Sequence, residues 1–159
     1  MYKVLLVAVI VAVGAYFFWA QKLNPETIDN PVYAEFRVDA EAGSRTLNMV
    51  LIAETASDAD CEQRADKFWR HVLDGCPSCT FRSKACKHEL EPRYSRLFEK
   101  EPTYTTYVAM TRGNRYERSG RLVVWGLTDR ESQWLCGTMA GAIRGKYSGQ
   151  IECINRRAS

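Results

Sequence analysis

The chain has 159 residues, of which 46% are hydrophobic and 26% are charged, and its formal net charge at pH 7 is +3. This balance is ordinary for a globular protein and excludes a wholly disordered chain. The small positive charge gives no reason to expect a nucleic acid among the partners.

Residues 4–20 read VLLVAVIVAVGAYFFWA and contain no charged side chain. As a helix this run would be about 26 Å long, close to the roughly 30 Å hydrocarbon layer of a bilayer. Aromatic residues gather at its far end, where they favour the membrane–water boundary. A cleaved signal peptide is the alternative, but Phe18 occupies a position where cleavage needs a small residue. The sequence therefore predicts a transmembrane anchor over residues 1–22, a polar linker over residues 23–31 and one domain over residues 32–159.

Six cysteines lie in the predicted domain, and an even, clustered set of this kind is expected in an oxidising compartment. Lys3 and the N-terminal amine favour a cytoplasmic N-terminus. No Asn-x-Ser/Thr glycosylation acceptor occurs, which favours a bacterial over a eukaryotic envelope. We therefore predict a single-pass protein of the bacterial inner membrane that contacts the bilayer through residues 4–20 and holds its C-terminal domain in the periplasm.

The first half of the predicted domain contains two strands and a helix. Residues 32–40 alternate apolar and polar side chains, which indicates a half-buried strand, and residues 45–54 return as a second strand. The MVLIA core of the second strand is apolar on both faces and predicts a central position in the sheet. Ser57 and the acids after it are typical of a helix start, and we expect the helix to end at Gly75.

The second half repeats this order. Residues 103–111 and 121–127 predict two strands, because they are rich in aromatic and β-branched side chains. The segment from Thr128 to Glu131 has the form of a capping box, so a helix begins there. We expect a last short strand over residues 150–155.

Two features of the helices and their connection complete the expected fold. Residues 76–102 have no regular pattern, and we expect a disulfide-tied excursion with a short helix near residues 93–99. Gly137 and Gly141 lie four residues apart, which predicts a helix face that approaches a neighbouring backbone closely. The fold class is therefore α+β, with a mainly antiparallel sheet of about five strands, two helices on one face and the order ββα-ββα-β.

The repeated order suggests an internal duplication of residues 32–75 and 103–149. The alternative is that ββα is simply a common unit, since two copies are too few for a solenoid array. Each helix carries one cysteine that is followed by another at a similar distance. This spacing predicts disulfides between Cys136 and Cys153 and between Cys61 and Cys79, which leaves Cys76 with Cys86.

The CPSC segment at Cys76 and Cys79 has two other interpretations. A CxxC pair can be a thiol–disulfide exchange centre when a helix N-terminus lowers the pKa of its first thiol, but this pair follows a helix. Zinc is the other interpretation, with Cys76, Cys79, Cys86 and His88 as ligands, although CKH is too tight for a standard zinc knuckle. We predict structural disulfides, and no metal or cofactor.

No nucleophile elbow, metalloprotease helix or phosphate loop occurs, so the sequence favours a non-enzymatic function. The turn between the strands at residues 103–111 and 121–127 carries a cluster of arginines with one tyrosine. This cluster could be a docking contact for an acidic partner or for lipid phosphates, and the alternative is a merely solvated turn. The candidate partner-binding residues are Arg112, Arg115, Tyr116, Arg118 and Arg121.

These observations predict a membrane-anchored periplasmic protein-binding module. An immunity or inhibitor protein that intercepts a toxin, and an accessory subunit of an envelope or secretion complex, fit equally well. Two alternatives from other classes remain, a thiol–disulfide oxidoreductase that uses Cys76 and Cys79 and an envelope protein that binds anionic lipids.

Overall fold

The computed structural model describes residues 28–157, the side chains of residues 71–75 excepted. The predicted anchor at residues 1–22 lies outside this range. In the described part of the chain, no helix has the length and apolar character needed to cross a membrane.

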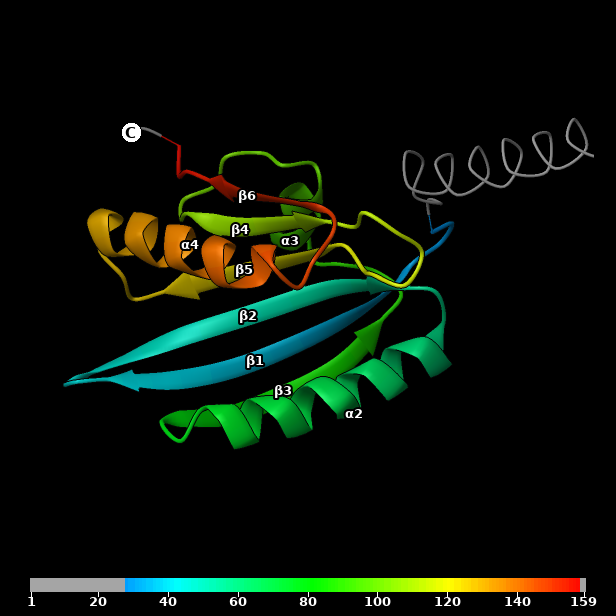
Figure 1. Ribbon diagram of the computed structural model, residues 1–159, viewed down its shortest axis with the longest axis horizontal. Helices are drawn as coiled ribbons and strands as arrows, with labels where there is room; N and C mark the ends of the chain where they lie inside the picture. Colours follow the sequence, from blue (N-terminus) through cyan, green and yellow to red (C-terminus); the bar gives the residue numbers. More distant parts are fainter. Residues whose placement is uncertain (1–27, 158–159) are drawn as a thin grey trace, which may run out of the picture.

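The described domain is α+β with one six-stranded sheet, in which every neighbouring pair of strands is antiparallel (Figure 1). The α+β class and the antiparallel sheet are thereby confirmed, whereas the predicted order ββα-ββα-β is wrong because it lacks one strand and the short helix α3 (Pro92–Phe98). The strand order in the sheet is β3-β1-β2-β5-β4-β6. The elements are β1 (Val32–Ala42), β2 (Arg45–Thr55), α2 (Asp58–Gly75), β3 (Cys79–Lys87), α3 (Pro92–Phe98), β4 (Tyr107–Thr111), β5 (Gly120–Trp125), α4 (Asp129–Arg144) and β6 (Gln150–Ile154).

The additional strand is β3, which occupies much of the segment expected to be irregular. It lies at the edge of the sheet and pairs only with β1, with a register shift between Arg37 and Val38. Most of its side chains are polar or exposed, including Arg82 and Lys84. The sequence of such an edge strand lacks the alternation of apolar and polar side chains that predicts a strand. Its place in the sheet follows only from its backbone pairing.

The helices lie in two layers. Helices α2 and α4 cover one face of the sheet, as predicted, whereas the short helix α3 covers the other (Figure 1). Strand alternation explains the division, since successive side chains point to opposite faces. On β2, Ile52 packs with Tyr94 of α3, whereas its neighbour Leu51 packs in the cluster beneath α2.

The two halves of the sheet are arranged alike about its centre. In each half the third strand pairs with the first, so β3 lies outside β1 and β6 lies outside β4. One of the two central pairs of the β2–β5 ladder is Leu51 with Leu122, which lie 71 residues apart (51 to 122). The helix N-caps Ser57 and Thr128 have the same separation (57 to 128). The halves are therefore related by an approximate two-fold axis through the centre of the sheet, and their common ancestry stays a prediction.

The helix starts follow the sequence closely. The Ser57 hydroxyl accepts a hydrogen bond from the Asp60 amide, and Thr128 and Glu131 form the predicted capping box. The glycine prediction for α4 was wrong. Gly137 and Gly141 are exposed, and a Cβ at either position would meet no atom of a neighbouring element within 4 Å. The close backbone approach occurs instead at Gly149, which packs against the Thr111 carbonyl where a side chain would not fit.

Candidate functional site

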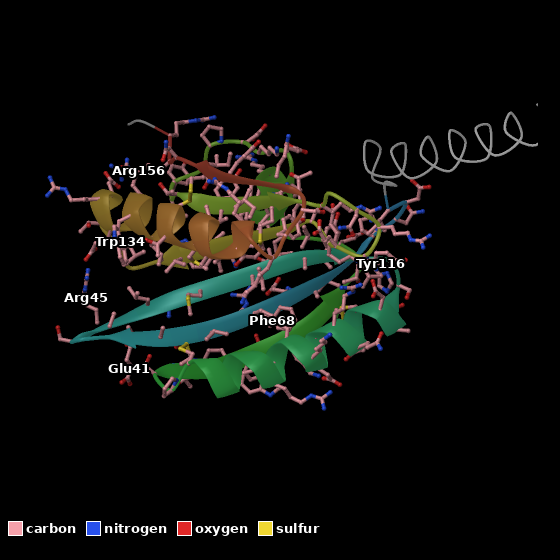
Figure 2. The ribbon with its side chains drawn as sticks, in the orientation of Figure 1. Glu41, Arg45, Phe68, Tyr116, Trp134 and Arg156 are labelled. Atoms are coloured by element: carbon pink, nitrogen blue, oxygen red, sulfur yellow. A yellow bond between two sulfur atoms is a disulfide. The ribbon has the colours of Figure 1, made fainter. Side chains whose placement is uncertain are left out.

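An apolar groove lies on the α2/α4 face, over the centre of the sheet. The two helices run antiparallel and flank the central strands (Figure 1). Between them is a hollow of about 500 Å³, with Leu51 and Leu122 in its floor. Its walls include Phe68 from α2, which Figure 2 shows between that helix and the sheet, and Met139 and Ile143 from α4. This volume lies in the range of ordinary ligand pockets.

The groove continues toward the end of the domain where β1 begins. A second hollow of about 400 Å³ shares Phe36, Leu51 and Phe68 with the first, so the two adjoin along the same face. Small side chains from β1 and β2 line the extension. Its rim carries three cationic residues, Arg64 and Lys67 from α2 and Arg118 from the β4–β5 loop. The groove therefore has an apolar length and one basic end.

The lining of the groove is adaptable and only partly covered. The chain has four methionines, and Met49, Met110 and Met139 all line this one site. These three side chains, like Leu51 and Leu122, are half-buried. Flexible thioethers fit surfaces of varied shape, and large uncovered apolar surfaces usually mark sites of interaction.

The apolar floor follows from the strand that the sequence analysis placed at the centre. The MVLIA run of β2 sends Val50 and Ile52 into the core beneath α3. Met49 and Leu51, which alternate with them, point to the groove. A strand that is apolar on both faces is expected to be buried on both. Here only one face is fully buried.

Asp60 organises the basic rim. Its carboxylate accepts hydrogen bonds from Arg64 at 2.6 Å, from Arg118 at 2.9 Å and from the Ala56 amide at 3.0 Å. Burial would raise the pKa of Asp60, but the Ala56 amide and the two guanidinium groups outweigh it and lower that pKa below its ordinary value. The pairing fixes the two arginines at the groove mouth while leaving an excess of positive charge there.

The five residues predicted at the hairpin tip do not form one exposed patch. Arg121 is only 3% exposed and Arg112 only 8%. Arg118 is held by Asp60, and its side chain is 14% exposed. Only Arg115 and Tyr116 lie at the surface, with Tyr116 71% exposed. The Arg115 guanidinium lies 4.8 Å from the centre of the Tyr116 ring and donates a hydrogen bond to its hydroxyl at 2.6 Å.

Arg121 has a structural role beneath α3. Its guanidinium donates to the carbonyl oxygens of Leu97 and Phe98 at the end of that helix, and to those of Met110 and Gly120. Burial lowers its pKa from the ordinary value for arginine. The alternation of side chains along β5 could have predicted that Arg121 lies on the α3 side, because successive side chains face opposite sides of the sheet and Leu122 faces the groove.

The six cysteines form three disulfides, and the predicted bond between Cys136 and Cys153 is present. The other two predicted pairings were wrong, because the structure joins Cys61 to Cys86 and Cys76 to Cys79. The physical reason is β3, which runs back along α2 and brings Cys86 beside the first turn of that helix.

These disulfides bear on the two alternative interpretations of the CPSC segment. All three cysteines of the zinc hypothesis are in disulfides, and the described side chains, which exclude those of residues 71–75, contain no group of three that could hold a metal ion. Cys76 is the C-cap of α2 and not a helix N-terminal residue. The helix dipole there disfavours a thiolate. The Cys76–Cys79 bond instead lines the apolar part of the groove.

No family model, curated protein or solved structure matches the chain. The function is therefore argued from the groove and its surroundings.

Proposed function

We propose that the protein is a membrane-tethered, extracytoplasmic protein-binding module whose groove between α2 and α4 receives an amphipathic helix of a partner protein. The observation that carries this proposal is the uncovered, methionine-lined groove over Leu51 and Leu122. An isolated domain with a half-buried floor at its centre gains by covering it, at roughly 25 cal/mol for each Å² of apolar surface removed from water.

The shape and chemistry of the groove favour a helix as the occupant. A helix that lies in a groove anchors itself through apolar side chains on one face, spaced at about every third or fourth position. Flanking walls from two antiparallel helices, Phe68 on one side and Met139 on the other, suit such a face. Arg64 and Arg118 lie at one end only. They favour a partner helix whose end at this rim carries acidic residues.

The tether and compartment remain those expected from the sequence. Residues 1–22 would hold the domain at the inner membrane, and three disulfides suit an oxidising periplasm. A partner of this kind is a toxin, if the protein is an immunity or inhibitor protein, or a subunit of an envelope complex. The oxidoreductase alternative is disfavoured by the position of Cys76 at a helix C-terminus.

Site-specific photo-crosslinking in cells tests this proposal. The photoreactive residue p-benzoylphenylalanine replaces Met139 in the groove or, as a matched control on the exposed side of the same helix, Gln133. We expect one discrete protein adduct from position 139 and none from position 133. The cross-linked segment should be an amphipathic helix with acidic residues at one end, and a synthetic peptide of that segment should suppress the adduct.

A second variant separates loss of binding from loss of folding. Leu122→Asp places a charge in the half-exposed floor and should abolish the adduct at position 139 while the three disulfides still form. Equal adducts at positions 139 and 133, an adduct with lipid alone, or an adduct that survives Leu122→Asp would each contradict the proposal.

A further inference from the structure

The start of β1 and the turn of the β4–β5 hairpin lie at the same end of the domain (Figure 1). The Val32 carbonyl accepts a hydrogen bond from the Thr55 hydroxyl at 2.6 Å, which joins the start of β1 to the end of β2. The Glu54 amide in turn donates to the Ser119 carbonyl at 2.9 Å, which joins β2 to the hairpin. The chain therefore enters the domain beside the loop that carries Tyr116 (Figure 2).

This loop is held in one shape by its own hydrogen bonds. The Glu117 carboxylate accepts from the amides of Gly113 at 2.9 Å and Ser148 at 2.6 Å. The Asn114 side chain donates to the Ser148 hydroxyl at 2.8 Å, so the loop is joined to the segment between α4 and β6. These contacts present the Arg115 and Tyr116 side chains outward from a fixed backbone.

The charges at this end favour an anionic surface. Arg115 is exposed, and so is Lys146 on the adjoining loop. Two of the acids at this end are engaged within the domain, since Asp60 binds two arginines and Glu117 binds two amides. Tyr116 adds an exposed ring with a polar tip, the kind of side chain that favours the boundary between headgroups and hydrocarbon.

We infer that Arg115 and Tyr116 form a headgroup contact through which the domain rests on anionic phospholipids. This inference rests on the proposed tether at residues 1–22, which would bring the bilayer to the end of the domain where β1 begins. Arg115 binds lipid phosphate, and the Tyr116 ring lies among the headgroups. The basic mouth of the groove then opens near the membrane. The β1–β2 turn with Glu41 and Arg45, at the opposite end of the domain from Tyr116 (Figure 2), would point away from it.

The test uses the full chain in lipid nanodiscs made of phosphatidylcholine, with or without phosphatidylglycerol. The photoreactive residue p-benzoylphenylalanine replaces either Tyr116 or, at the opposite end, the exposed Glu41. Lipid adducts at position 116 should exceed those at position 41, and phosphatidylglycerol should be enriched in them. Arg115→Glu should lower that enrichment by about fivefold, whereas Arg130→Glu, an exposed charge reversal on α4, should leave it unchanged.

The outcomes separate this inference from the proposed function. Co-purification of the chain with the nanodisc tests the tether, and a chain that stays outside the disc would overturn both the tether and the headgroup contact. A chain that enters the disc but gives equal lipid adducts at positions 116 and 41 would overturn the headgroup contact alone. An enrichment that Arg115→Glu leaves intact would also overturn it.

Discussion

The two halves of the domain, β1-β2-α2-β3 and β4-β5-α4-β6, differ most in what they place along the groove. Residues 71 positions apart face each other across the approximate two-fold axis, Leu51 with Leu122 and Phe68 with Met139. The centre of the groove is therefore built from matching apolar pairs. Its ends are not matched, because Arg64 of α2 corresponds to the apolar Leu135 of α4 (64 to 135). An almost symmetric scaffold thus acquires a direction from a few side chains.

The ion pairs that join the halves show the same relation. Each helix has an acid three residues after its N-cap, Asp60 in α2 and Glu131 in α4, again 71 positions apart (60 to 131). Each acid binds an arginine from the hairpin of the other half, Arg118 and Arg45 respectively. The first pair is partly buried at the groove mouth and the second is exposed at the far end. The less exposed pair, Asp60 with Arg118, is therefore expected to stabilise the domain more than the pair of Glu131 with Arg45.

The largest predicted effects concern the disulfides. The Cys61–Cys86 bond closes a separation of 25 residues and the Cys136–Cys153 bond one of 17. In the chain-entropy model, replacing both cysteines of a bond by alanine costs about 3.5 kcal/mol for the first and about 3 kcal/mol for the second. The Cys76–Cys79 bond spans only three residues, and its removal should cost about 1.5 kcal/mol.

Thermal and chemical unfolding of the purified full chain would measure this order. A larger loss from removing the Cys76–Cys79 bond than from removing either longer bond would contradict it. The comparison also tests whether each half depends on its own link between helix and third strand, since the two long bonds occupy corresponding places in the fold.

These bonds also show how far the sequence leads. Strand patterns, caps and apolar helix faces are local, and they predicted β1, β2, α2, β4, β5, α4, β6 and the class of the fold. The Cys136–Cys153 bond was found because both of its elements were recognised. The bonds of Cys61 and Cys76 were missed because β3 is a polar edge strand, and only its pairing with β1 fixes its position in the fold.

The groove could not be predicted for a related reason. Met49 and Leu51 were expected to be buried, because the MVLIA run was placed at the centre of the sheet, and nothing in the sequence shows that α2 and α4 leave the strip between them uncovered. That gap depends on where both helices rest on the sheet. The hairpin arginines show the same limit, since residues that cluster in sequence separate into the buried Arg121 and the exposed Arg115 once the strand pleat is in place.

The next largest effect is expected at Arg121, whose corresponding position in the first half is Val50 (50 to 121). Arg121→Ala should lower the free energy of unfolding by about 3 kcal/mol, because it leaves buried carbonyls at the end of α3 without their donor. Val50→Ala removes only apolar contacts and should cost about 1–2 kcal/mol. Arg121→Lys should also have a lower free energy of unfolding than wild type, since an ammonium cannot reproduce the forked hydrogen bonds of the guanidinium group.

Urea unfolding of the three variants gives this comparison directly. If Arg121→Ala were no more destabilising than Val50→Ala, the bonds to the α3 carbonyls would contribute nothing net, and the buried arginine would have to be explained otherwise.

A smaller effect distinguishes the two ion pairs between the halves. Arg118→Ala should destabilise the domain by about 1–2 kcal/mol, because it leaves a partly buried Asp60 with one arginine fewer. Arg45→Ala should have a lesser effect, since both partners of its pair are exposed. Raising the salt concentration to about 1 M should erase the difference between Arg45→Ala and wild type but not that between Arg118→Ala and wild type. Equal salt sensitivity of the two variants would show that burial does not distinguish the pairs.

The smallest predicted effect is the pH dependence of the exposed pair. Arg45 and the Thr128 amide and hydroxyl lower the pKa of Glu131 to about 2. An unfolded glutamate has a pKa of about 4.3, so Glu131 stabilises the fold fully above that pH and loses its contribution as the pH falls toward 2. Glu131→Gln should therefore have a lower melting temperature than wild type at neutral pH, and this difference should narrow between about pH 4.3 and 2. Melting temperatures followed on acidification measure it.

Asp60 sharpens this last comparison. Burial opposes the ionised form of Asp60, yet the Ala56 amide and its two arginines hold its pKa below the ordinary value. Its contribution has the same sign and is also lost at low pH, but high salt should leave it largely intact because the pair is partly buried. In about 1 M salt, the acid-dependent loss of stability of Glu131→Gln should shrink to the part that the Thr128 bonds supply, while that of Asp60→Asn persists. If neither loss shrank, the exposed hairpin contact would be as well shielded from salt as the one at the groove mouth, and the two ends of the domain would be electrostatically alike.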